Sequence, residues 1–240
     1  MDYRLKRYQK EFPFSYAEGV YSCIELLDAH PEHATRVLLS SSGERNSGVT
    51  QIIKICRNHS IPFEINDRLI ERICRNGKHL AVGVFNKYLS TIEPDKNHMV
   101  LVNPSDMGNT GTIARTMVGF GMVNLALIRP ALDYFDPKVI RASMGSILRL
   151  NIAYFDTLQD YQKAFNNNLY LFRTGEKSSI REASFIWPYS LVFGNESSGL
   201  PDDIDVQGTT ISIPQDNRID SLNLSVAAGI ALYESCREGF

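Results

Sequence analysis

The chain has 240 residues, of which 43% are hydrophobic and 22% are charged, the composition of an ordinary globular protein. Its 25 Lys and Arg and 27 Asp and Glu leave a formal charge of −2, which excludes a protein that holds nucleic acid by bulk positive charge alone. No apolar run approaches the roughly 18 residues of a membrane span, and no apolar stretch of a secretory signal follows MDYRLKRYQK. The four cysteines stand far apart with no CxxC pair, so we expect neither disulfides nor a zinc site, and a cytoplasmic protein.

Residues 1–90 are predicted to form a small α/β domain. Apolar spacing indicates three helices and three strands: helices at Tyr16–Ala29, Val49–His59 and Asp67–Arg75, and strands at Arg36–Ser40, Pro62–Ile65 and Ala81–Phe85. The polar segment Tyr88–His98 is the candidate linker.

The two halves of the chain differ in charge. Residues 1–97 hold 14 Lys and Arg against 12 Asp and Glu, a balance of +2, whereas the remainder is at −4. Arg4, Lys6, Arg7 and Lys10 concentrate positive charge at the N-terminal tip. This tip is either a solvated chain end or an arm that contacts nucleic acid, and the sequence leaves both open.

Residues 98–240 are predicted to form a second α/β domain with a parallel sheet covered on both faces, because its strands are continuously apolar and helical stretches separate the earlier ones. The predicted strands are Met99–Asn103, Asn124–Ile128, Asn151–Phe155, Asn168–Phe172, Ser190–Phe193 and Thr209–Ile213. Ligands bind at the carboxyl ends of strands in such sheets. Three loops at these ends carry the informative residues.

The first loop lies in the segment Asn103–Gly121 and leads to a helix predicted to begin near Gly111. Its Gly, Asn, Asp and Ser residues can present backbone N–H groups to an anion or a sugar. Asn109 lies in this loop, and Arg115, one turn into the helix, can reach a phosphate. A plain turn with a solvent-facing Arg is the alternative. The loop fits neither the GxxxxGK[ST] nor the GxGxxG phosphate-binding pattern.

The second loop, VFGNESSGL, follows the strand that ends at Phe193. Gly194 and Gly199 permit close approach of a ligand, and Glu196 can accept hydrogen bonds or orient a cation. The alternative is a helix start capped by Ser197 or Ser198.

The third loop follows Pro214, and Ser221 is predicted to cap the helix after it. Small residues at Ser225, Ala227, Ala228, Gly229 and Ala231 indicate that something packs closely against this helix, either its own sheet or a second subunit. Ser221 and Asn223 are expected to project from its first turn.

Together the three loops closely resemble the SpoU (TrmH-like) RNA 2′-O-ribose methyltransferases of the SPOUT superfamily. The first family motif matches Asn109, Gly111, Arg115 and Phe120-Gly121; the second, GxExxG, matches Gly194, Glu196 and Gly199. The third matches Ile213-Pro214 and SLNLS at 221–225, and Arg141–Ser146 is similar to the family's Ser-x-Gly turn. The match covers residues 99–240. The N-terminal domain resembles, more loosely, the family's α/β substrate-binding domain, whose His-Gln-Gly ending appears here only as His79–Gly83.

The resemblance implies a catalytic domain tied in a trefoil knot and a homodimer whose interface includes the first and last helices of that domain. It implies methyl transfer from S-adenosylmethionine to a ribose 2′-hydroxyl, with RNA as partner, rRNA favoured over tRNA, and with neither a metal nor a membrane. The cofactor-binding residues would be Gly194, Ile213, Leu222, Asn223, Gly199 and Thr174.

The resemblance also implies the catalytic residues Arg115, Asn109, Glu196, Ser221 and Asn223. Arg115 is either the group that takes the hydroxyl proton, with help from an RNA phosphate, or a phosphate anchor that stabilises the 2′-oxyanion. Asn109 would position the ribose or Arg115, Glu196 would orient one of those two residues, and Ser221 and Asn223 would hold the nucleotide. The rival hypotheses are a catalytically silent RNA-binding or assembly factor, a methyltransferase for protein or small molecules, and an unrelated nucleotide-binding protein.

Overall fold

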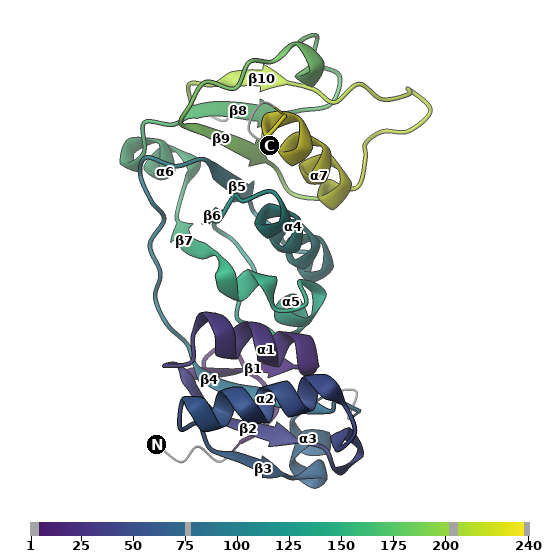
Figure 1. Cartoon of the computed structure of the whole chain (residues 1–240). Helices are drawn as coiled ribbons and strands as arrows, with labels where there is room; N and C mark the ends of the chain where they lie inside the picture. The colour runs from purple at the N-terminus through teal and green to yellow at the C-terminus, as the bar shows by residue number, and fades with distance from the viewer. Residues whose placement is uncertain (1–4, 75–77, 202–205, 238–240) are drawn as a thin grey trace. The chain divides into compact units, whose positions relative to one another are not determined.

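The computed structural model describes residues 5–74, 78–201 and 206–237 (Figure 1). Its contacts divide the chain into two compact units, Met1–Leu89 with Asp133–Arg149, and Ser90–Leu132 with Leu150–Phe240. The segment Asp133–Arg149, which lies inside the predicted second domain 98–240, thus packs with the unit formed by the start of the chain. The functional division into domains 1–90 and 98–240 stays a prediction.

The first unit is built on a four-stranded sheet in the order β1-β4-β2-β3, in which only β2 and β3 run parallel. Its elements are β1 (Phe14–Glu18), α1 (Val20–Ala29), β2 (Ala34–Leu39), α2 (Ser47–Asn58), β3 (Phe63–Ile65), α3 (Asp67–Ile73), β4 (Ala81–Asn86) and α5 (Pro137–Ala142). The predicted helix Tyr16–Ala29 is wrong in its first part, where β1 lies. Gly19, with φ at 95°, turns the chain between this strand and α1.

Helices cover both faces of this sheet because its strand residues alternate between two apolar clusters. Leu38 and Val82 face the cluster that contains Ile70 of α3. Val37 and Ala81 belong instead to the cluster of α1 and α2. The first unit is therefore a three-layer α/β structure.

The second unit contains six parallel strands in the order β10-β8-β9-β5-β6-β7. Its elements are β5 (His98–Val102), α4 (Met107–Gly119), β6 (Asn124–Ile128), β7 (Asn151–Phe155), α6 (Leu158–Ala164), β8 (Asn168–Phe172), β9 (Tyr189–Phe193), β10 (Thr209–Ile211) and α7 (Leu224–Ser235). The parallel α/β sheet predicted from the six apolar runs is confirmed.

The central strands β5, β6 and β9 are buried along their whole length because helices lie on both sides of them. On one side, Leu158 and Tyr161 of α6 join the cluster formed by Val100, Ala126 and Val192. The other two large helices, α4 and α7, pack against each other, and α7 also contacts β9 (Figure 1).

The return of the chain from β10 at the sheet edge to α7 beside β9 and α4 is consistent with a knot, and the trefoil knot itself stays a prediction. The four cysteines are free thiols. Among the described residues, no helix combines the length and the apolar character that crossing a bilayer requires.

Candidate active site

The carboxyl ends of β8, β9, β5 and β10 lie at one edge of the second sheet, because the strands are parallel neighbours. A pocket of about 470 Å³ opens at this edge. Its wall comes from the segments after β8, β9 and β10 and from the first turn of α7. The lining residues are Phe172, Arg173, Thr174, Glu176, Phe193, Gly194, Asn195, Glu196, Ser197, Ser198, Gly199, Leu200, Ile213, Gln215, Asp220, Ser221, Leu222, Leu224 and Ala227.

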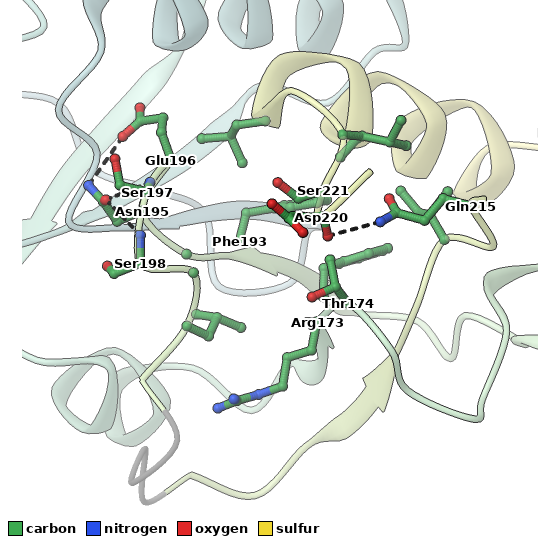
Figure 2. Close-up of a pocket in the computed structure, with 18 of the residues that line it drawn as sticks. Arg173, Thr174, Phe193, Asn195, Glu196, Ser197, Ser198, Gln215, Asp220 and Ser221 are labelled. Carbon is green, nitrogen blue, oxygen red and sulfur yellow. Dashed lines mark hydrogen bonds between the residues drawn. The ribbon is translucent and has the colours of Figure 1, made fainter. Parts of the chain in front are cut away.

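The loop after β9 forms a closed turn in one wall of the pocket (Figure 2). Asn195 and Gly199 exchange two backbone hydrogen bonds, and a Cβ on Gly194 would lie only 2.0 Å from the carbonyl carbon of Gly199. Glycine is therefore required at position 194. The Asn195 side chain accepts hydrogen bonds from the backbone N–H groups of Ser197 and Ser198. These serines lie in this turn, and in the part of the chain that the structure describes neither of them caps a helix.

Glu196 connects this turn to the loop after β5. Its carboxylate accepts hydrogen bonds from Ser105 Oγ at 2.9 Å, from the Asp106 N–H at 3.0 Å and from the Ser105 N–H at 3.3 Å. The neighbouring Asn195 amide donates to the Asn103 carbonyl at 2.8 Å. Two of the three predicted loops are thus joined directly.

Helix α4 begins at Met107, four residues earlier than predicted, because the Asp106 side chain caps it by accepting a hydrogen bond from the Asn109 N–H. Asn109 therefore lies in the first turn of the helix, not in the loop. Arg115 lies two turns further along α4 and is exposed.

The third loop ends at Asn223, which is the N-cap of α7 in place of the predicted Ser221. Its side-chain oxygen accepts hydrogen bonds from the N–H groups of Ser225 and Val226. Asn223 also donates through Nδ2 to Oδ1 of Asn109 at 3.0 Å, which joins the start of α7 to the start of α4. Ser221 lies before the helix, in the wall of the pocket.

Further side chains fix the course of the third loop. Gln215 donates to the Asp220 carbonyl at 3.1 Å (Figure 2). Arg218 donates two hydrogen bonds to the Asp216 carboxylate, at 2.8 and 3.0 Å, and these bonds hold the pKa of that exposed carboxyl below its ordinary value. The loop is shaped by its own side chains before it enters α7.

The pocket brings together two of the predicted catalytic residues, Glu196 and Ser221, and all but one of the predicted cofactor-binding residues: Thr174, Gly194, Gly199, Ile213 and Leu222. Asn223 lies in sequence between Leu222 and Leu224, which both line the pocket. Asn109 is connected to the pocket wall through Asn223, and Arg115 is not among the lining residues.

Several lining residues lie outside the motifs predicted from the sequence. The rings of Phe172 and Phe193 stack at 4.3 Å with an angle of 10° between their planes. Arg173, Glu176 and Asp220 also line the pocket, and the Arg173 side chain donates to the Pro201 carbonyl. The strand-end rule that selected the other loops also indicates Phe172 and Arg173, since they end and follow β8.

The pocket suits a ligand with an apolar ring and a cationic part. Phe172, Leu200, Ile213 and Leu222 offer apolar surface, and the loop backbones offer hydrogen-bonding groups. The lining residues include three with a carboxylate, Glu176, Glu196 and Asp220, and one with a guanidinium, Arg173. This net negative lining favours a ligand with positive charge, such as the sulfonium and ammonium groups of S-adenosylmethionine.

A parallel α/β sheet with a pocket at its strand ends is the arrangement of a ligand-binding α/β protein, and comparison with known proteins identifies the family. Residues 96–233 match the SpoU rRNA Methylase family, and the chain belongs to it. It is an RNA methyltransferase that uses S-adenosylmethionine and acts on a ribose 2′-hydroxyl.

Relatives and solved structures agree with this family. An uncharacterized tRNA/rRNA methyltransferase of Synechocystis is 33% identical over 202 residues, which are 73% of each chain. A putative tRNA (cytidine(34)-2′-O)-methyltransferase of Bacillus subtilis is 34% identical and covers 59% of this chain and 92% of its own. The AdoMet-bound rRNA methyltransferase of Sinorhizobium meliloti has a TM-score of 0.78 at 26% identity, covering 95% of this chain and 88% of that one.

Proposed function

We propose that the pocket described above binds S-adenosylmethionine and that the acceptor ribose of an RNA lies beside Asn109 and Asn223. The observation that carries this proposal is the hydrogen bond between these two side chains. It places polar groups at the N-terminal ends of α4 and α7, next to pocket residues Ser221 and Leu224. Helix N-termini favour phosphate and the polar groups of a nucleotide.

S-adenosylmethionine supplies a methyl group that the positive charge on its sulfur already activates. The chain must hold the 2′-hydroxyl in line and favour the loss of its proton. No His lies in the three loops. We assign Arg115 to an RNA phosphate and to electrostatic stabilisation of the developing oxyanion, since a guanidinium stays protonated at working pH.

Glu196 has a supporting part in this proposal. Three of its hydrogen bonds hold Ser105 and Asp106, and Asp106 caps the helix that carries Asn109 and Arg115. Glu196 therefore positions both residues through the start of α4. Ser221 would contact the nucleotide from the pocket wall, and Thr174, Gly194, Gly199, Ile213 and Leu222 would bind the cofactor.

We assign rRNA as the substrate in preference to tRNA. The similarity to an rRNA methyltransferase structure extends over 95% of this chain, whereas the tRNA (cytidine(34)-2′-O)-methyltransferase of Bacillus subtilis matches 59% of it. The additional first unit supplies an RNA-binding surface. Lys6, Arg7 and Lys10 are exposed there, and Arg4 lies outside the described residues.

The working form is proposed to be a cytoplasmic homodimer. Val226, Ile230 and Tyr233 of α7 are 51%, 37% and 64% exposed, and their spacing of four and three residues places them on one helix face. An exposed apolar stripe of this kind favours burial against a second copy.

The test is to map 2′-O-methylated riboses in total RNA from cells with and without this protein. We expect one rRNA ribose to lose its methyl group in the deletion strain and to regain it with the wild-type gene, but not with the Arg115→Ala variant. A lost methyl group in tRNA would refute the rRNA assignment. An unchanged ribose methylation map would refute the proposed reaction.

A further inference from the structure

A short turn in the first unit brings two imidazole rings and a carboxylate together. His30 ends helix α1, and Pro31, Glu32 and His33 follow it on the way to β2. Nδ1 of His30 lies 3.2 Å from Oε1 of Glu32, and Nε2 of His33 lies 3.6 Å from the same oxygen. The three ligand atoms all lie within 4.8 Å of one another.

The hydrogen bond on the far side of the His30 ring determines what Nδ1 presents to Glu32. Nε2 lies 2.9 Å from the carbonyl oxygen of Leu148, which only accepts, so Nε2 carries a hydrogen. In the neutral ring, Nδ1 then carries no hydrogen, and its lone pair faces the carboxylate oxygen of Glu32. The lone pair of Nδ1 and the carboxylate oxygen repel each other unless a proton or a metal ion lies between them. A ring N–H donated to a backbone carbonyl is also the usual outer contact of a metal-binding histidine.

Both rings are held in place before any ion arrives. The Tyr88 ring lies 4.3 Å from the His30 ring and stacks on the His33 ring at 4.7 Å with an angle of 19°. The His33 N–H donates to the His30 carbonyl, which closes the turn. Because the ligands are ordered in advance, binding costs less conformational entropy.

The surroundings also favour a cation. His30 is the C-cap of α1, where the negative end of the helix dipole lies. The Glu32 side chain is 60% exposed and that of His33 is 34% exposed, so solvent reaches the site and water can complete the coordination of an ion.

We propose that His30, Glu32 and His33 form a zinc-binding site that stabilises the turn between α1 and β2. Two imidazoles and one carboxylate are a ligand set that zinc accepts in proteins. The site lies within the first unit, and none of its three residues lines the pocket described above. Its role is structural, since the ion would hold the end of α1 against the start of β2.

A second cluster in the same unit, Glu18, Cys74 and His79, is less suited to a cation. In this cluster, Oε2 of Glu18 already lies 3.5 Å from Nη1 of Arg141. That positive charge opposes the binding of a divalent ion. The second cluster therefore serves as the internal comparison for the test.

The test is isothermal titration of zinc chloride into the metal-free, full-length protein and its variants. We expect one ion per chain, with affinity weakened more than about tenfold in His33→Gln and in Glu32→Gln. His59→Gln, which changes an exposed histidine of the same unit, should bind as the wild type does. Absence of binding to the wild type would overturn the proposal. So would unchanged binding in His33→Gln together with loss of binding in Cys74→Ser.

A spectroscopic measurement supplies a readout that does not depend on affinity. Zinc should shift the Nδ1 resonance of His30 in ¹⁵N spectra, while Nε2 keeps its attached hydrogen. If Nδ1 carries a hydrogen both with and without zinc, a proton occupies the position and the assignment of a zinc site is wrong. Zinc should also raise the unfolding temperature of the wild type and leave that of His33→Gln unchanged.

Discussion

The side-chain amide of Asn223 donates to Oδ1 of Asn109 at 3.0 Å, although 114 residues separate them in sequence. The oxygen of the same Asn223 amide caps α7. The Asn223 side chain thus caps α7 and also holds the Asn109 side chain at the start of α4. Capping uses Oδ1 of Asn223 and the bond to Asn109 uses Nδ2, so a substitution can remove one role and keep the other.

Asn223→Ala should lose both functions, with a loss of about 1 kcal/mol in the free energy of unfolding and a marked fall in turnover. Asn223→Ser keeps a capping oxygen but has no amide to reach Asn109. We therefore expect its unfolding curve to match the wild type while its turnover stays low. Denaturant unfolding and a methyl-transfer assay on the RNA substrate measure the two effects. Full turnover in the serine variant would show that the bond to Asn109 is dispensable.

Glu196→Gln should weaken the start of α4. The carboxylate accepts three hydrogen bonds from Ser105 and Asp106, and a neutral amide oxygen replaces a charged acceptor poorly. We expect turnover to fall about tenfold, which corresponds to about 1.4 kcal/mol. Glu182→Gln, an exposed change in the same unit, is the matched control. Equal activity of the two variants would remove Glu196 from the positioning of the loop.

The sequence predicted the strands of the second unit well because buried parallel strands are continuously apolar, as Leu125–Ile128 is. It placed the starts of both site helices wrongly. Asp106 competes with Asn109 as the cap of α4, and Asn223 competes with Ser221 as the cap of α7, since all four residues are Asp, Asn or Ser, which are good caps. Asn223 also makes a tertiary hydrogen bond to Asn109, which the sequence does not reveal.

Other features had no usable signal in the sequence. The packing of Asp133–Arg149 with the first unit depends on contacts such as Ser15 Oγ with the Phe135 carbonyl, between residues 120 positions apart. The ligand cluster at His30, Glu32 and His33 was visible as HPEH, but the spacing alone did not indicate that the two rings face one carboxylate.

Arg115→Ala should abolish methyl transfer and leave affinity for S-adenosylmethionine nearly unchanged, because Arg115 is exposed on α4 and is not among the pocket-lining residues. Calorimetric titration with the cofactor and single-turnover kinetics on RNA check the two statements. Arg181→Ala, which removes another exposed guanidinium of the same unit, should retain activity. Turnover at the wild-type rate in Arg115→Ala would exclude this residue from the mechanism.

Ile230→Asp should convert the proposed dimer to monomers. The charge would lie in the middle of the stripe formed by Val226, Ile230 and Tyr233, and burying an unpaired carboxylate is costly. Light scattering after size-exclusion chromatography gives the mass directly. Lys163→Asp, at an exposed position of α6, is the control and should leave the mass unchanged. A wild-type protein that is already monomeric at micromolar concentration would contradict the dimer.

His98 should make the second unit sensitive to acid. The buried ring receives a hydrogen bond from Tyr161 and donates one to the Glu93 carbonyl, and burial lowers its pKa despite that second bond, which raises it. The unfolded chain binds a proton below its ordinary pKa of about 6.5, before the folded chain does. Stability is therefore complete above that pH and falls as the pH is lowered through it, by up to about 1.4 kcal/mol per pH unit. Chemical unfolding between pH 7.5 and pH 5 measures the slope, which should be shallower in His98→Gln than in His59→Gln. Equal slopes in the two variants would mean that other groups control the acid response.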